Sequence, residues 1–289
     1  MNGINHKPKV IARLFAIVLA LVTLLSTAVY AIDGSPDIHE NSSYNTNTYN
    51  EVNLSPVEYD EDGNEIAWVL SPESDSATPY ATNLELLITK ITVSKTSSGF
   101  SWKVNVDCPS SIIFKPRVSL HVELQRSTGS SSGIYSTVAQ KTIDEVNYLT
   151  NYVLTTSATT GYYRAVVTYT DLNSGRKQTS YTPNNLYNRS AKRWAYSYDD
   201  PVSGKELAPP RANWSYIPGT SHDGTYRNYY LTQYKSRYGI DLIAIQDPSD
   251  PFEIHHQRPL SYGGDSSFDN LIHLPKSLHQ QVSGWFNGY

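Results

Sequence analysis

The sequence has little cysteine, little net charge and no apolar run long enough to cross a membrane. Cys108 is the only cysteine in 289 residues, which excludes an intramolecular disulfide. The formal net charge is −4, which argues against nucleic-acid binding through the charge of the whole chain. With 39% hydrophobic and 17% charged residues, the composition argues against a polytopic membrane protein, and the longest apolar run, Leu14–Leu25, is shorter than the roughly 20 residues of a spanning helix.

Tyrosine is abundant, with 23 residues against 6 phenylalanines and 5 tryptophans. Tyrosine together with serine and threonine is typical of exposed β-sheets, in which the ring packs and the hydroxyl remains solvated. The composition therefore favours a chain that is largely β. At 289 residues it is long enough for two ordinary domains.

The N-terminus has the pattern of an export signal. Lys7, Lys9 and Arg13 precede the apolar run Leu14–Leu25, and a Val-Tyr-Ala step ends at Ala31. This predicts a signal peptide over residues 1–31, cleaved after Ala31, with an uncleaved anchor as the alternative. We therefore expect a secreted protein with no stable membrane association after cleavage.

Residues 32–81 are acidic, since residues 32–80 contain Asp and Glu but no Lys or Arg. Such a composition favours a disordered linker or pro-segment, in which only Ile66–Leu70 has a strand pattern. An acidic mask over a basic site is the alternative interpretation.

Residues 82–183 alternate apolar and polar side chains in several short runs, as in Phe100–Val106 and Val118–Leu124. Gly- and Ser-rich turns separate these runs, so we expect about seven antiparallel strands in a β-sandwich. The run Gly161–Val167 resembles the penultimate strand of extracellular immunoglobulin-like modules. We expect this domain to act in spacing, display or adhesion, and residues 184–221 to form a connector.

The chemistry-bearing residues lie in the expected domain 222–289. The pattern predicts a strand over 252–256, a Gly-Gly loop over 257–269, a second strand over 271–274 and a helix over 275–285. A further helix is expected over 223–239, with Tyr226, Tyr230, Tyr234 and Tyr238 forming a packing stripe. His273 is expected to be exposed or near substrate.

Adjacent residues of a strand point to opposite faces, so His255 and His256 cannot normally bind the same ion. One imidazole can face a metal while the other faces a water molecule. His279, on the helix, can complete the metal site. A metal ion together with a separately held imidazole is suited to hydrolysing a phosphodiester.

Residues 252–285 resemble the HNH nuclease motif, or ββα-metal finger, and within it the bacteriocin-type DNases of colicins and pyocins. The residues that carry the resemblance are Glu253, His255, His256, Pro259, Gly263, Gly264, Asp269, Asn270 and His279. The fold class expected for the chain is therefore multidomain: an all-β immunoglobulin-like sandwich followed by a small α+β HNH nuclease domain.

The resemblance implies a role for each matching residue. His255 and His279 would be metal ligands, His256 the general base, and Asn270 the residue that fixes the loop and His256. Glu253 would support a ligand. From their charge and position, Arg258 and Lys276 are candidates for holding substrate phosphates, although a solvated surface role is equally consistent with the sequence.

One position departs from the family pattern, because Ser283 stands where the bacteriocin DNases place a further histidine. Two protein ligands with open positions favour Mg²⁺ over tightly held Zn²⁺, and Zn²⁺, Mn²⁺ and Ni²⁺ remain alternatives.

The sequence thus favours a secreted metal-dependent HNH endonuclease, acting as a toxin or as a scavenger of extracellular nucleic acid. Its substrate would be nucleic acid, with DNA favoured, and an immunity or inhibitor protein is a candidate partner. Residues 186–289 carry as many acidic as basic residues, which argues against strong nonspecific DNA binding. The alternative is a catalytically inactive extracellular binding or adhesion protein, in which a bound metal ion only stabilises the ββα finger.

Overall fold

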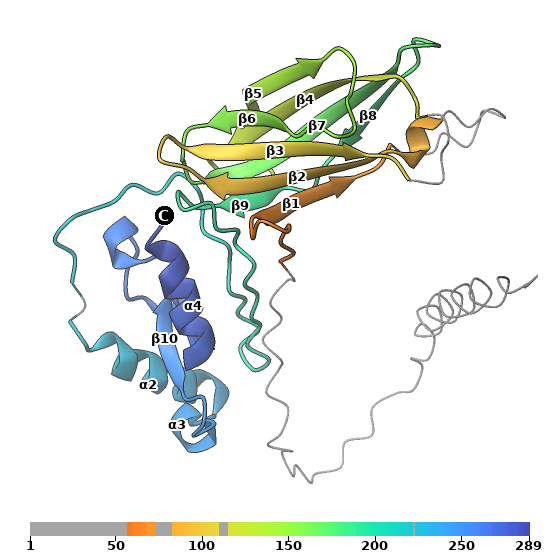
Figure 1. Cartoon of the computed structure of the whole chain (residues 1–289). Helices are drawn as coiled ribbons and strands as arrows, with labels where there is room; N and C mark the ends of the chain where they lie inside the picture. The colour runs from red at the N-terminus through yellow and green to blue at the C-terminus, as the bar shows by residue number, and fades with distance from the viewer. Residues whose placement is uncertain (1–56, 73–82, 110–114, 222) are drawn as a thin grey trace, which may run out of the picture. The chain divides into compact units, whose positions relative to one another are not determined.

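The computed structural model describes residues 57–72, 83–109, 115–221 and 223–289 (Figure 1). The predicted export signal, its cleavage point after Ala31 and residues 32–56 of the expected linker lie outside the described residues. In the part of the chain that the structure describes, no helix is long and apolar enough to cross a membrane.

Two antiparallel sheets form the N-terminal part of the described structure (Figure 1). The four-stranded sheet has the order β1-β2-β3-β6, and the five-stranded sheet has the order β5-β4-β7-β8, with β9 paired to β7. The strands are β1 (Glu65–Leu70), β2 (Ile88–Lys95), β3 (Phe100–Asp107), β4 (Val118–Ser127), β5 (Ser136–Ile143), β6 (Tyr152–Thr156), β7 (Gly161–Asp171), β8 (Lys177–Tyr181) and β9 (Asn185–Tyr187).

The two sheets share one hydrophobic core. In β3, alternate residues are buried from Phe100 to Val106, and β4 shows the same alternation, as the sequence predicts. Trp102 of β3 lies at the centre of the core, where its ring contacts Tyr163 of β7 and Tyr187 of β9 with centroid distances of 5.2 and 5.7 Å. Its Nε1 donates a hydrogen bond of 2.9 Å to Thr156 Oγ1, which satisfies the polar atom of this buried ring.

The β region extends beyond the expected boundaries 82–183 at both ends. Strand β1 lies in the segment expected to be a disordered linker, and it pairs with β2 over Glu65–Leu70. Strand β9 lies in the expected connector and pairs with β7. Long-range contacts stabilise both: Trp68 packs on Trp102 at 5.6 Å, and the Tyr187 hydroxyl donates to Glu65 Oε1 at 3.1 Å.

The C-terminal region is a small α+β unit. Its elements are α2 (Tyr226–Tyr238), α3 (Leu242–Ile245), β10 (Phe252–His256), the short 3-10 turns η2 (Leu260–Tyr262) and η3 (Phe268–Asn270), β11 (Leu271–Pro275) and α4 (Lys276–Phe286). Strands β10 and β11 form an antiparallel hairpin, with Phe252 opposite Pro275 and His256 opposite Leu271. The predicted order of strand, loop, strand and helix over 252–285 is therefore confirmed.

Each face of this hairpin packs against a different helix. On one face, Ile272 and Leu274 form a cluster with Leu278 and Val282 of α4. On the other face, Phe252, Ile254 and Leu271 pack with the buried rings of Tyr230 and Tyr234 of α2. The tyrosine stripe of α2 is thus a packing surface, as predicted, and β10 lies beside α4 in Figure 1.

The C-terminal region and the two sheets belong to one compact unit, residues 48–289. Trp285 and Tyr289 form a hydrophobic cluster with Tyr162 of β7 and Leu186 of β9. Asn188 Nδ2 donates to the carbonyl oxygen of Trp285 at 2.7 Å across this cluster. A fragment beginning at residue 186 would break β9 and open this cluster, so experiments on the site require the full chain.

Candidate active site

The histidines of β10 point to opposite faces of the hairpin, as the strand alternation predicts. The ring of His255 lies against His279 and Phe286 of α4, with centroid distances of 5.3 and 6.2 Å. The ring of His256 lies against Tyr226 of α2, with a centroid distance of 4.7 Å. The two imidazoles therefore have different surroundings, although they are neighbours in sequence.

His255 is a buried histidine with an unsatisfied nitrogen. Its exposed fraction is 5%, and its Nε2 atom has no hydrogen-bond partner among the described residues. Burial, together with the nearby imidazoles of His279 and His256, lowers the pKa of His255 to about 3. The ring is therefore neutral at physiological pH. A buried polar atom without a hydrogen-bond partner lowers the free energy of unfolding by about 1–3 kcal/mol. A ligand bound at this nitrogen would remove that cost.

His279 is held by a carboxylate. Its Nδ1 lies 2.5 Å from Glu253 Oε2, and Glu253 shares its face of β10 with His255. Burial lowers the pKa of His279 although Glu253 opposes this effect, so the ring is neutral and its Nδ1–H donates to the carboxylate. The lone pair of His279 then lies on Nε2. A carboxylate that fixes the tautomer in this way is a common support for metal-binding histidines.

These residues fit a divalent ion held by two imidazoles. His255 has an unpartnered nitrogen, His279 has its second nitrogen fixed by Glu253, and the two rings are neighbours. Within the described ranges, no group of three or more His, Cys, Asp or Glu residues is arranged to hold a metal ion. A two-ligand site leaves positions for water and phosphate oxygens, whereas a structural Zn²⁺ site is closed by four protein ligands.

His256 is held by a hydroxyl from the loop. Its Nε2 lies 3.2 Å from Ser266 Oγ, and its exposed fraction is 5%. Ser266 and Tyr226 together restrict the rotation of the ring. A restrained imidazole that does not belong to the His255–His279 pair is available to act as a general base.

Asn270 clamps the loop between β10 and β11. Its Oδ1 accepts from Arg258 N at 2.9 Å, and its Nδ2 donates to the carbonyl oxygens of Arg258 and Asp265 at 2.9 and 2.7 Å. The resemblance implies that Asn270 fixes the loop and His256. The side-chain hydrogen bonds of Asn270 go to the backbone of Arg258, two residues after His256, and of Asp265, so the effect on His256 is indirect.

The absence of a side chain at Gly264 leaves room for the hydrogen bonds of Asn270, and we predict that Gly264→Ala disrupts these bonds. A Cβ at this position would lie 1.8 Å from Arg258 O and 2.9 Å from Asn270 Nδ2. We expect a loss of about 2–4 kcal/mol in the free energy of unfolding, measured by urea denaturation. The matched control is Gly284→Ala in α4, where a Cβ meets nothing within 4 Å and should stabilise by up to about 1 kcal/mol. Equal stability of the two variants would contradict the clamp.

The two basic candidates differ in position. Arg258 is exposed; its Nε donates to Tyr262 O at 2.7 Å, and its guanidinium lies 5.6 Å from the centroid of the Trp214 ring. Lys276 is exposed at the first position of α4, and its side chain has no hydrogen bond or ion pair within the described ranges. Neither side chain contacts the His255–His279 pair in the contacts that the structure records.

The expected exposure of His273 is wrong, because this residue is buried, with an exposed fraction of 8%. It faces α2, where its Nδ1 lies 3.1 Å from the Tyr230 hydroxyl and 3.9 Å from Asp200 Oδ2. Asp200, which is 1% exposed, also accepts from the Tyr234 hydroxyl at 2.9 and 2.8 Å. Sequence reasoning missed this cluster because Asp200 lies in the expected connector, far along the chain from α2 and β11.

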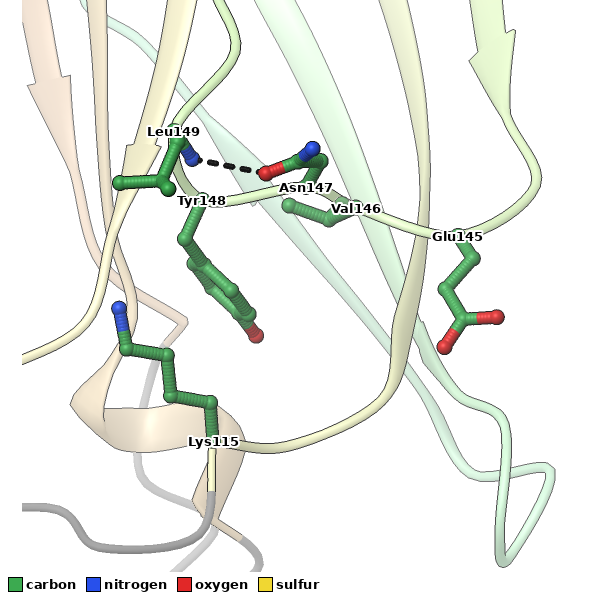
Figure 2. Close-up of a pocket in the computed structure, with 6 residues that line it drawn as sticks. All are labelled: Lys115, Glu145, Val146, Asn147, Tyr148 and Leu149. Carbon is green, nitrogen blue, oxygen red and sulfur yellow. Dashed lines mark hydrogen bonds between the residues drawn. The ribbon is translucent and has the colours of Figure 1, made fainter.

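Apart from the histidine site, a hollow lies in the two-sheet region (Figure 2). It has a volume of about 430 Å³, and Lys115 lies over the ring of Tyr148 at 5.1 Å. Glu145 also lines the hollow and pairs with Arg117 at 2.7 Å. It contains neither histidine nor a cluster of carboxylates, so it offers no chemistry comparable to that of β10 and α4.

Comparisons of the chain with models of protein families, with curated proteins and with solved structures find no match.

Proposed function

We propose that this chain is a metal-dependent phosphodiesterase, and more specifically an endonuclease of the HNH type that most resembles the bacteriocin DNases. The observation that carries the proposal is the unpartnered Nε2 of buried His255 beside His279, with His256 on the opposite face of the same strand. The two-sheet region, which resembles an immunoglobulin-like sandwich, would position the nuclease rather than take part in the chemistry.

In the proposed reaction, His256 accepts a proton from a water molecule as the water oxygen bonds to phosphorus. The bond between phosphorus and the 3′-oxygen breaks, which leaves a 5′-phosphate and a 3′-hydroxyl once that oxygen is protonated. His255 and His279 would hold the divalent ion, which supplies stabilisation of the charge on the phosphate and on the leaving oxygen. Asn270 holds the loop that carries Ser266, and Ser266 restrains the His256 ring.

The remaining proposals follow from the sequence. The basic and apolar N-terminus favours export, so the substrate would be nucleic acid outside the cytoplasm, with DNA favoured. A secreted toxin and a scavenger of extracellular nucleic acid both fit. A toxin would require an immunity or inhibitor protein as a partner in the producing cell.

A cleavage assay tests this proposal. The full chain is incubated with supercoiled plasmid, with single-stranded DNA and with RNA, each in the presence of Mg²⁺, Mn²⁺, Zn²⁺, Ni²⁺ or a chelator. We expect cleavage that depends on the added metal and stops on chelation. If the folded protein cleaves none of these substrates with any metal, the proposed nuclease function is contradicted. The result would then favour a binding or adhesion protein, in which the metal ion only stabilises the ββα finger.

A further inference from the structure

An aromatic hollow lies at the junction of the two-sheet region and the C-terminal region. It has a volume of about 440 Å³, and its walls contain four aromatic side chains and one charged one: Trp214, Tyr216, Tyr262, Tyr289 and Arg189. Threonine and alanine residues complete the lining, and no acidic residue contributes to it. The hollow is thus lined mainly by aromatic rings and carries one positive charge, that of Arg189.

The aromatic wall is partly fixed and partly open. The rings of Tyr262 and Tyr289 lie 4.6 Å apart, and Tyr289 is 6% exposed with its hydroxyl accepting from Trp214 N at 2.9 Å. Tyr216 is 65% exposed, and its ring lies 5.9 Å from that of Tyr262. The Tyr262 and Tyr289 rings thus form a fixed floor, and the exposed ring of Tyr216 lies at its edge. The open face of the Tyr216 ring can stack on a planar ligand, and every nucleobase has such a planar face.

The charge of the hollow favours an anionic ligand. The Arg189 side chain is exposed and has no ion pair or hydrogen bond within the described ranges, whereas its backbone nitrogen is fixed by a 2.7 Å bond to Gly288 O. An unpaired guanidinium beside tyrosine rings that pack edge to face matches a phosphate attached to a base. A neutral sugar ring would use the aromatic wall but not the arginine.

The hollow is continuous with the loop of the candidate active site. Tyr262 belongs to this loop, and its carbonyl accepts from Arg258 Nε at 2.7 Å. The guanidinium of Arg258 in turn lies over the Trp214 ring, and the backbone of Arg258 is held by Asn270. One loop therefore carries both the wall of the hollow and the residues that restrain His256.

We propose that this hollow binds one unstacked nucleotide of the substrate strand, adjacent to the position that is cleaved. The base would stack on the exposed ring of Tyr216 with its edge toward Tyr262, and its phosphate would lie at Arg189. This inference rests on the proposed nuclease function and deepens it. Because only an unpaired base can enter the hollow, single-stranded or locally opened nucleic acid is the favoured substrate.

A binding experiment without metal tests the proposal separately from cleavage. The full chain in chelator is titrated with a fluorescent eight-nucleotide single-stranded DNA, and the dissociation constants of Tyr216→Ala and Arg189→Ala are compared with that of the unchanged chain. We expect Tyr216→Ala to weaken binding roughly five- to thirtyfold. Arg189→Ala should weaken binding and lower the slope of log affinity against log salt by about 1. Tyr181→Ala and Lys90→Ala, which change exposed residues of β8 and β2, are the matched controls and should bind like the unchanged chain.

The outcomes distinguish the hollow from the nuclease. Unchanged affinity in both hollow variants would overturn the nucleotide site while leaving plasmid cleavage as an independent test of the proposed function. Weakened binding with no cleavage under any metal would support the site but contradict the nuclease. Binding of a neutral N-acetylglucosamine trimer that is lost in Tyr216→Ala, with no binding of the oligonucleotide, would also overturn the proposal.

Discussion

Replacing His256 with alanine should lower the cleavage rate by about 10²–10⁴-fold, which is the usual contribution of a general base. Metal binding should persist, because His255 meets His279 of α4 on the face of the hairpin opposite to His256. The measurement pairs initial rates on plasmid DNA with calorimetric titration of Mn²⁺. Circular dichroism checks that the variant is folded, since His256 is buried against Tyr226.

Two further variants make this result specific to His256. His121→Ala changes an exposed histidine of β4, which pairs with Glu123 at 3.4 Å, and should leave the rate unchanged. Ser266→Ala removes the hydroxyl that restrains the His256 ring and should lower the rate less than the loss of the imidazole does. Loss of metal binding together with activity in His256→Ala would mean that the roles of His255 and His256 are reversed.

The sequence predicts the local frame of the candidate site because that frame is encoded locally. The strand period of two separates His255 from His256, and the helical period places Leu278, Val282 and Trp285 on the buried face of α4. Gly264 and Asn270 mark a tight loop. Each of these features depends on residues close together in sequence, so periodicity and turn chemistry identify it.

The features that sequence reasoning missed depend on distant contacts. Strand β1 is expected from the sequence only as a strand pattern within a disordered linker, and its place in the sheet depends on the pairing with β2 and on the stacking of Trp68 on Trp102. His273 is buried because Tyr230 of α2 and Asp200 of the connector provide polar partners. No pattern within β11 indicates those partners, which lie more than forty residues away along the chain.

The net charge of the sequence is a weak guide to whether this protein binds nucleic acid, because it does not show which charged groups are already paired. Residues 186–289 have no net charge, yet some of their acidic residues are engaged in hydrogen bonds with neutral groups, such as that of Asp200 with the Tyr234 hydroxyl. Arg189 and Lys276 have no such partners within the described residues. Local positive charge is therefore available to substrate phosphates even where the sum over the region is zero.

Replacing His255 with leucine should stabilise the metal-free protein and abolish its response to metal. The unpartnered Nε2 of His255 costs folding free energy, and a leucine fills a similar volume among His279 and Phe286 without a polar atom. We expect the free energy of unfolding in chelator to rise by about 1 kcal/mol. The increase in melting temperature that Mn²⁺ produces in the unchanged chain should disappear, because binding to the folded state is lost.

His273→Leu is the matched control, since His273 is also buried and lies on the neighbouring strand β11. Unlike His255 it has a partner, and its loss leaves the Tyr230 hydroxyl buried without a bond. We expect the free energy of unfolding to fall by about 1–3 kcal/mol while the response to Mn²⁺ remains. The two histidines should therefore give opposite changes in stability and opposite responses to metal. A decrease in stability for both variants would show that His255 is a structural histidine, whereas the predicted contrast would show that the fold retains an unfavourable buried nitrogen for the ligand it binds.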